Sequence, residues 1–110
     1  VKEDVIIFSF KYPVLAKIRQ LDTDIPILWL INKADNMTLE NAIIIESNAI
    51  GVGPETTVTK EYLNFAHENN IEVWKWTVNK EDEMQRLIDL GLDGIITDFP
   101  DKALKKLSSK

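Results

Sequence analysis

Cysteine is absent from the 110 residues, histidine occurs once, and glycine and proline occur only four times each. Without cysteine the chain has neither a disulfide framework nor a thiolate that could act as nucleophile or metal ligand. No apolar run approaches the roughly 20 residues that cross a membrane, so we expect no membrane span in this sequence. The 45% of hydrophobic residues argues against disorder and predicts a globular chain.

The distribution of charge excludes one class of partner. The formal net charge is -5, and the 13 basic residues are scattered along the chain. A protein that binds nucleic acid concentrates basic residues on one face. We therefore predict no nucleic-acid partner.

Short apolar runs alternate with longer amphipathic segments. Several of the runs are apolar at consecutive positions, which is typical of parallel strands buried on both faces. The predicted strands are residues 5–10, 27–31, 49–52, 71–78 and 94–97.

The segments between the strands carry helix start and stop signals. Pro13 suits a first helical turn, segment 33–48 is predicted to hold a short helix begun by Thr38, and Pro100 begins a terminal helix. The predicted caps of the other two helices are Thr59 with an exit at Asn69 and Asn70, and Asn79 with an end at Gly91.

Two architectures fit this run of about five βα units with right-handed crossovers. One is a doubly wound, flavodoxin-like sheet that is complete in itself; the other is the last five units of a (β/α)8 barrel. The pattern alone slightly favours the doubly wound sheet, because a barrel requires roughly 250 residues.

A motif in the last third of the chain reverses that preference. Residues 76–79 read W-T-V-N, and residues 91–100 read G-L-D-G-I-I-T-D-F-P. At this spacing the two halves resemble the C-terminal signature of the glycerophosphodiester phosphodiesterase family. The resemblance extends more loosely over the other strands. It implies an α/β fold in which residues 1–110 are the C-terminal portion of that domain, five βα units of an incomplete (β/α)8 barrel.

Barrels of this type place their chemistry at the carboxyl ends of the strands. In the family, the tryptophan that matches Trp76 forms an apolar wall beside the glycerol end of the substrate, and Phe10 belongs to a family S-F pattern. The resemblance thus implies Trp76 and Phe10 as substrate-binding residues, although Lys11 stands where the family often has Asp or Asn. Further strand-end candidates are Ser9, Trp29, Asn79, Thr97 and Asp98.

Other polar residues have simpler structural interpretations. Asp98 is expected to cap the terminal helix, and Trp74 is expected in the core. His67 lies within a helix and has no acidic or nucleophilic partner at a telling spacing, which favours a surface histidine. The acidic group at residues 81–83 is expected to be a solvated helix start.

The resemblance also implies an activity, the hydrolysis of glycerophosphodiesters to glycerol phosphate and an alcohol. Family members use two histidines, one in an H-R-G motif, and a divalent cation, Ca or Mg, held by Glu and Asp from early strands. The sequence contains no H-R-G, no P-E-N-T and no second histidine. We therefore predict that this chain supplies the substrate-side wall but no catalytic or metal-binding residue, and that it is inactive alone.

Two alternatives remain at this stage, a non-catalytic module derived from the barrel and a flavodoxin-like binding domain. An open section of a barrel also leaves sheet edges unpaired, which favours self-association of the isolated chain.

Overall fold

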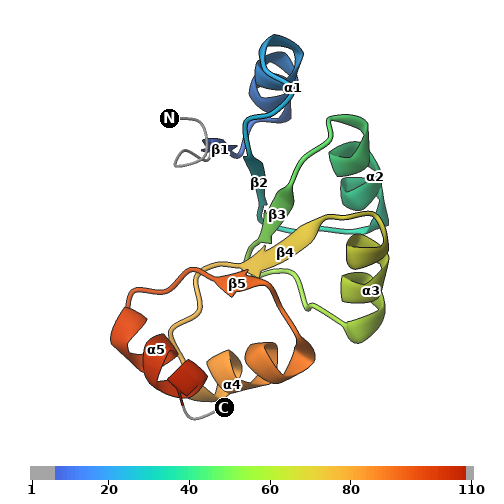
Figure 1. Ribbon diagram of the computed structural model, residues 1–110. Coiled ribbons are helices and arrows are strands. Elements are labelled where there is room, and N and C mark those ends of the chain that lie inside the picture. Colours follow the sequence, from blue (N-terminus) through green and yellow to red (C-terminus); the bar gives the residue numbers. More distant parts are fainter. Residues whose placement is uncertain (1–6, 109–110) are drawn as a thin grey trace.

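The computed structural model describes residues 7–108, which form five strands and five helices in strict alternation (Figure 1). The strands are β1 (Ile7–Ser9), β2 (Ile27–Ile31), β3 (Ala49–Val52), β4 (Glu72–Lys75) and β5 (Gly94–Ile95). The helices are α1 (Tyr12–Leu21), α2 (Asn36–Ile44), α3 (Lys60–Glu68), α4 (Glu81–Leu90) and α5 (Pro100–Ser108). No helix within these residues has the length and apolar character to cross a membrane.

The strands form one sheet in the order β1-β2-β3-β4-β5, and each neighbouring pair is parallel. A doubly wound sheet must reverse its direction of growth at a switch point. Here each crossover adds the next strand beside the last, as in a barrel. The sequential order therefore contradicts the doubly wound alternative.

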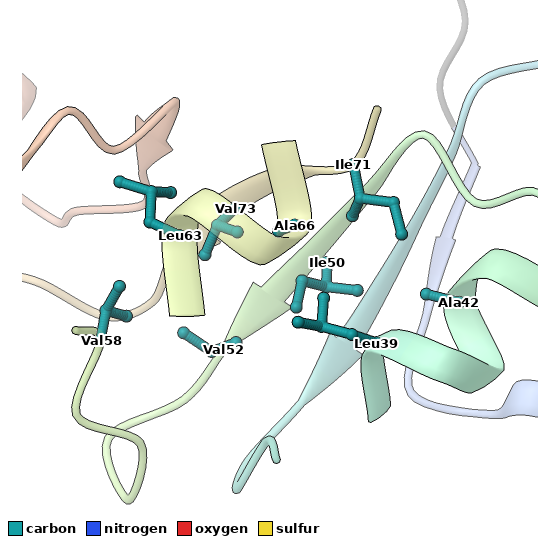
Figure 2. Packing of buried hydrophobic residues seen from close by; sticks show 9 residues of the cluster. All are labelled: Leu39, Ala42, Ile50, Val52, Val58, Leu63, Ala66, Ile71 and Val73. Carbon is teal, nitrogen blue, oxygen red and sulfur yellow. The ribbon is translucent and has the colours of Figure 1, made fainter. Parts of the chain in front are cut away.

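An apolar layer lies between the sheet and helices α2 and α3. Figure 2 shows side chains of both helices directed at those of β3 and β4. Because burial of one Val, Leu or Ile contributes about 1.5–3 kcal/mol, this layer holds the helices to the sheet. Its buried members are Leu39, Ala42, Ile50, Val52, Val58, Leu63, Ala66, Ile71 and Val73.

The helix ends confirm some predicted signals. The Thr59 side chain caps α3 by accepting a hydrogen bond from the Tyr62 N–H at 3.1 Å. Gly91 ends α4 with φ of 98°, a left-handed conformation that suits glycine.

The predicted start of α2 at Thr38 is wrong. Asp35 is the N-cap, and it forms a capping box in which its side chain accepts from the Thr38 N–H while the Thr38 hydroxyl accepts from the Asp35 N–H. Thr38 is therefore the third helical residue, a position at which a polar side chain completes the box.

The opposite face of the sheet is a second apolar layer, which faces the inside of the barrel. Leu28, Leu30 and Ala49 are buried there, with Trp74 and Trp76 packed against them. The layer is continuous but partly exposed towards the β1 edge, where 62% of Phe8 is accessible.

β2 and β3 have the predicted bounds, whereas the other three strands are shorter than predicted. β4 ends at Lys75, so the side-chain alternation does not continue to Val78. Alternation along the predicted strand 71–78 would place Val78 on the inner face with Trp76. Instead Val78 is 3% exposed and packs with Met84 and Leu87 of α4 on the helix side. β5 ends at Ile95 instead of residue 97, and the predicted strand residues 5 and 6 lie outside the described part of the chain.

Candidate functional site

Phe10 and Trp76 meet at the carboxyl ends of β1 and β4. Their ring centroids are 5.5 Å apart, and the rings are nearly perpendicular at 87°. Three strand spacings separate β1 from β4 in a flat sheet, roughly 14 Å. The inner face must therefore be concave for the two rings to touch, and the sheet brings together the two residues that the sequence predicted as substrate-binding.

The Trp76 indole is held in a fixed place on this face. Its Nε1–H donates to the Gly51 carbonyl at 2.8 Å. Its six-membered ring lies so close to Gly53 that a Cβ there would stand 2.6 Å from Trp76 Cζ2. Glycine at position 53 thus makes room for the indole at the end of β3.

The two rings border an apolar hollow of about 410 Å³ on the inner face. Trp74, predicted to be core, is half-buried and lines the same hollow. The full lining is Phe8, Phe10, Leu28, Leu30, Trp74, Trp76, Thr77 and Ile96. Such a surface can take the carbon side of a small molecule but offers few polar contacts to it.

Asn79 joins the two halves of the sequence motif. Its side-chain carbonyl oxygen accepts from the Asp98 N–H at 2.9 Å and from the Thr97 hydroxyl at 3.2 Å. Its amide nitrogen donates to the Asp98 carboxylate at 3.0 Å. This network fastens the segment after β4 to the segment after β5 at the carboxyl end of the sheet.

The same contacts correct two predictions. Asn79 does not cap α4, because the N-cap residue is Lys80 and the Asn79 side chain faces Asp98 instead. Asp98 was expected to cap α5, yet its carboxylate is hydrogen-bonded to the neighbouring loop. Both residues serve the connection between loops.

Two other candidates lie away from the hollow or have local roles. Trp29 packs at 4.9 Å from the Tyr12 ring and contacts the helix-side clusters, because it alternates with Leu28 and Leu30 along β2. The Ser9 hydroxyl accepts from the Lys11 N–H at 3.0 Å and shapes the turn after β1.

His67 is a half-exposed helical residue, as predicted, but it has an acidic partner that the sequence did not reveal. Its Nε2 lies 2.7 Å from Asp93 Oδ2, an oxygen that also accepts from the Val73 N–H at 2.7 Å. Asp93 precedes β5, so the pair lies at the amino end of the sheet, opposite the Phe10–Trp76 pair. The acidic start of α4 is exposed in part, and Glu83 pairs there with Arg86 at 3.0 Å.

Sequence reasoning also missed a polar cluster beside Trp76. The Asn32 amide donates to the Glu55 carboxylate at 2.7 Å, across the loops that follow β2 and β3. Lys75, which is 7% exposed, contacts the loop after β3 from the helix side of β4. Burial lowers the pKa of Lys75, an effect opposed by the negative charge of Glu83 and reinforced by the positive charge of Arg86.

The sequence profile of the Glycerophosphoryl diester phosphodiesterase family matches residues 1–102 of the chain. A glycerophosphodiester phosphodiesterase of Bacillus subtilis (strain 168) is 31% identical over 100 residues, which cover 88% of this chain and 34% of that protein. A glycerophosphodiester phosphodiesterase of Bacillus altitudinis is 44% identical over 48 residues, which cover 44% of this chain and 20% of that protein.

Solved structures agree with the fold. A phosphodiesterase of Oleispira antarctica, in complex with the product sn-glycerol-3-phosphate, superposes on 94% of this chain with a TM-score of 0.83 at 17% identity. A glycerophosphodiester phosphodiesterase of Parabacteroides distasonis superposes on 98% of it with a TM-score of 0.74 at 19% identity. At such identities the likeness concerns the fold, and it confirms the predicted section of a (β/α)8 barrel.

The chain spans less than half of these proteins, with 34% of the Bacillus subtilis relative, 41% of the Oleispira antarctica chain and 44% of the Parabacteroides distasonis chain covered. The profile match extends over most of its residues and includes both halves of the motif that Asn79 and Asp98 join. The chain therefore belongs to the glycerophosphoryl diester phosphodiesterase family.

Proposed function

We propose that residues 1–110 are the C-terminal section of a phosphodiesterase domain that hydrolyses glycerophosphodiesters to glycerol phosphate and an alcohol. The observation that carries the proposal is the Phe10–Trp76 pair, which stands at the carboxyl ends of β1 and β4 in a chain of this family. Flat apolar rings suit the carbon side of a glycerol unit. The sn-glycerol-3-phosphate bound by the Oleispira antarctica phosphodiesterase supports a small phosphate ester as ligand.

In this proposal the chain forms the substrate-side wall and transfers no proton. Hydrolysis of a phosphodiester needs a base that activates water and an acid that protonates the leaving alkoxide. The single histidine, His67, is bound to Asp93 at the amino end of the sheet, away from Trp76. We therefore propose that the acid and the base come from outside residues 1–110.

A divalent cation, Ca or Mg, belongs to the proposed activity, since members of the family generally depend on one. Within residues 7–108, no group of three His, Cys, Asp or Glu side chains is arranged to hold a metal ion. These described residues do not fit a cation site, and we propose that its ligands also come from outside this chain.

The test uses the complete polypeptide that contains this chain, assayed with glycerophosphocholine and added Ca or Mg. We expect Trp76→Ala to lower kcat/KM roughly 5- to 150-fold, which corresponds to about 1–3 kcal/mol of lost apolar contact. Phe65→Ala is the matched control, because Phe65 is a partly exposed aromatic residue on the outer helix α3. Equal kinetics of both variants would show that Trp76 does not belong to the substrate site. Absence of turnover in the wild type would favour a non-catalytic module.

We further propose that residues 1–110, prepared alone, associate with a second copy through the inner face and remain inactive. Phe8 and Phe10 there are 62% and 60% exposed, and the adjoining β1 is an edge strand. An exposed apolar face beside an open edge favours pairing between chains. Sedimentation of the isolated chain tests this: a monomer contradicts the association, and metal-dependent turnover contradicts the assignment of the chemistry to other residues.

A further inference from the structure

Lys75 is a buried cation that the proposed reaction does not use. It lies on β4 between Trp74 and Trp76, and the alternation of the strand directs it to the helix side while both tryptophans face the barrel interior. Only 7% of the residue is exposed. Burying a lysine is unfavourable unless its ammonium group is hydrogen-bonded, so its partners indicate what it does.

The partners are the two ends of one tight turn. The Lys75 Nζ donates to the Gly53 carbonyl at 2.7 Å and to the Thr56 carbonyl. The turn is closed by the Thr56 N–H, which donates to the Gly53 carbonyl at 3.1 Å. Lys75 thus ties β4 to the turn of residues 53–56, which follows β3 at the carboxyl end of the sheet.

The turn carries groups that lie next to the candidate site. The Thr56 hydroxyl accepts from the Ala34 N–H at 2.8 Å and donates to the Asn32 carbonyl at 3.1 Å, which joins the turn to the loop after β2. Glu55, in the middle of the turn, accepts from the Asn32 side chain at 2.7 Å. The turn therefore holds a carboxylate and an amide in a defined place at the rim of the sheet.

The first residue of the turn also supports Trp76. Gly53 is in contact with the indole from the inner side, since a Cβ there would stand 2.6 Å from Trp76 Cζ2. Its carbonyl binds the Lys75 ammonium from the helix side. Lys75 and Trp76, which are adjacent in sequence, hold the end of β3 from its two faces.

We propose that Lys75 is a positioning residue, whose ammonium fixes the turn of residues 53–56 and thereby sets the place of the Trp76 indole and the Glu55 carboxylate at the mouth of the barrel. Its kinetic consequence rests on the proposed phosphodiesterase function. Its structural consequence does not, because the contacts that carry it lie within this chain.

The test compares Lys75→Met with Lys60→Met in the complete polypeptide. Methionine nearly matches lysine in length but cannot donate, so Lys75→Met leaves the turn unattached to β4. The control removes a lysine that also donates to a backbone carbonyl, that of Leu90 at 3.2 Å, but at an exposed position between α3 and α4. Each protein carries 5-fluorotryptophan, and the fluorine resonance of Trp76 is identified by its loss in Trp76→Phe.

We expect Lys75→Met to shift the Trp76 fluorine resonance and to raise KM for glycerophosphocholine roughly three- to tenfold, the size produced by loss of one hydrogen bond to a positioned group. We expect kcat to stay within about twofold, because the wall contacts substrate equally before and during the reaction. Lys60→Met should change neither quantity. Lys75→Arg, which keeps charge and donors, should recover part of the KM.

The proposal is overturned if Lys75→Met has the same Trp76 resonance and the same KM as Lys60→Met, even if its thermal stability has changed. If Lys75→Met does not fold, Lys75→Gln, which keeps an amide donor, is judged by the same two measurements. If the wild-type polypeptide shows no turnover, the proposed function fails, and the fluorine resonance alone decides the role of Lys75.

Discussion

Replacement of Gly53 by alanine tests the geometry of the site most directly. Gly53 is buried immediately after β3, and a Cβ at this position would stand 2.6 Å from Trp76 Cζ2 and 2.8 Å from both the Cα and the carbonyl oxygen of Asn32. Two of these three atoms belong to the backbone of the segment after β2, which cannot rotate away. The methyl group must therefore displace the indole, the loop or both.

Gly51→Ala provides the matched comparison, because Gly51 lies two residues earlier on the same face. A Cβ there would meet Leu30 Cδ2 at 2.7 Å, the far end of a flexible side chain, while Trp76 Cδ1 is at 3.4 Å. Overpacking of a well-packed core costs about 1–3 kcal/mol. We place Gly53→Ala at the upper end of that range, and Gly51→Ala at about 1 kcal/mol or less, because a change in the Leu30 side chain relieves its contact.

The assay measures both unfolding in urea and KM for glycerophosphocholine in the complete polypeptide. Gly53→Ala should lower the free energy of unfolding and raise KM together, because the displaced group is the proposed substrate wall. Gly51→Ala should leave KM near the wild-type value. A Gly53→Ala protein with unchanged stability and kinetics, or a Gly51→Ala protein impaired to the same degree, would refute the proposed contact between Gly53 and Trp76.

Two further variants separate stability from function. Arg19→Met should destabilise the protein by about 2–3 kcal/mol without changing KM. The buried guanidinium lies at the amino end of the sheet, where it donates to the carbonyls of residues 22, 45 and 46 and to the Asn48 side chain. A changed KM at unchanged stability would contradict this placement. Because burial lowers the pKa of Lys75, the folded protein releases its proton at a pH where the unfolded chain, with a pKa of 10.5, still binds it. The free energy of unfolding should therefore rise with pH between the lowered pKa and 10.5. Urea unfolding measured across this interval should show that rise in the wild type and not in Lys75→Met. An identical pH dependence in the wild type and Lys75→Met would contradict the lowered pKa.

The order of strands and helices was predictable because it depends on local patterns. Consecutive apolar runs identified buried parallel strands, and Thr59 and Gly91 marked helix ends by their own backbone and side-chain chemistry. The start of α2 was misplaced because Asp35 and Thr38 are both good capping residues three positions apart. Only the structure shows that they cap the helix jointly.

The candidate site was predictable only in part. Phe10 and Trp76 were among the candidates because the carboxyl ends of parallel strands meet at one edge of a sheet, and the family resemblance distinguished them from the other strand-end residues. The roles of Lys75 and Asp93 depend on partners about 20 or more residues away, and no periodicity reveals them. Val78 was misplaced for a related reason, since alternation holds only while the strand continues and β4 stops at Lys75.

The spacing between the two halves of the motif, residues 76–79 and residues 91–100, follows from the geometry of one βα unit. α4 has ten residues and spans about 15 Å, close to the length of a four- or five-residue strand at roughly 3.3 Å per residue. The helix therefore returns the chain far enough for β5 to run beside β4 with their carboxyl ends level. Asn79, which follows β4, can then reach Asp98, which follows β5.

This connection explains why the two halves of the motif act as one unit. Asn79 satisfies the Asp98 N–H and carboxylate together, so it fixes the end of one strand relative to the next. Trp76 lies three residues before Asn79, and its own ring is bound to Gly51 on the other side. The indole is thus held between β3 and the joined ends of β4 and β5, and a rigid apolar wall at the mouth requires both halves of the motif.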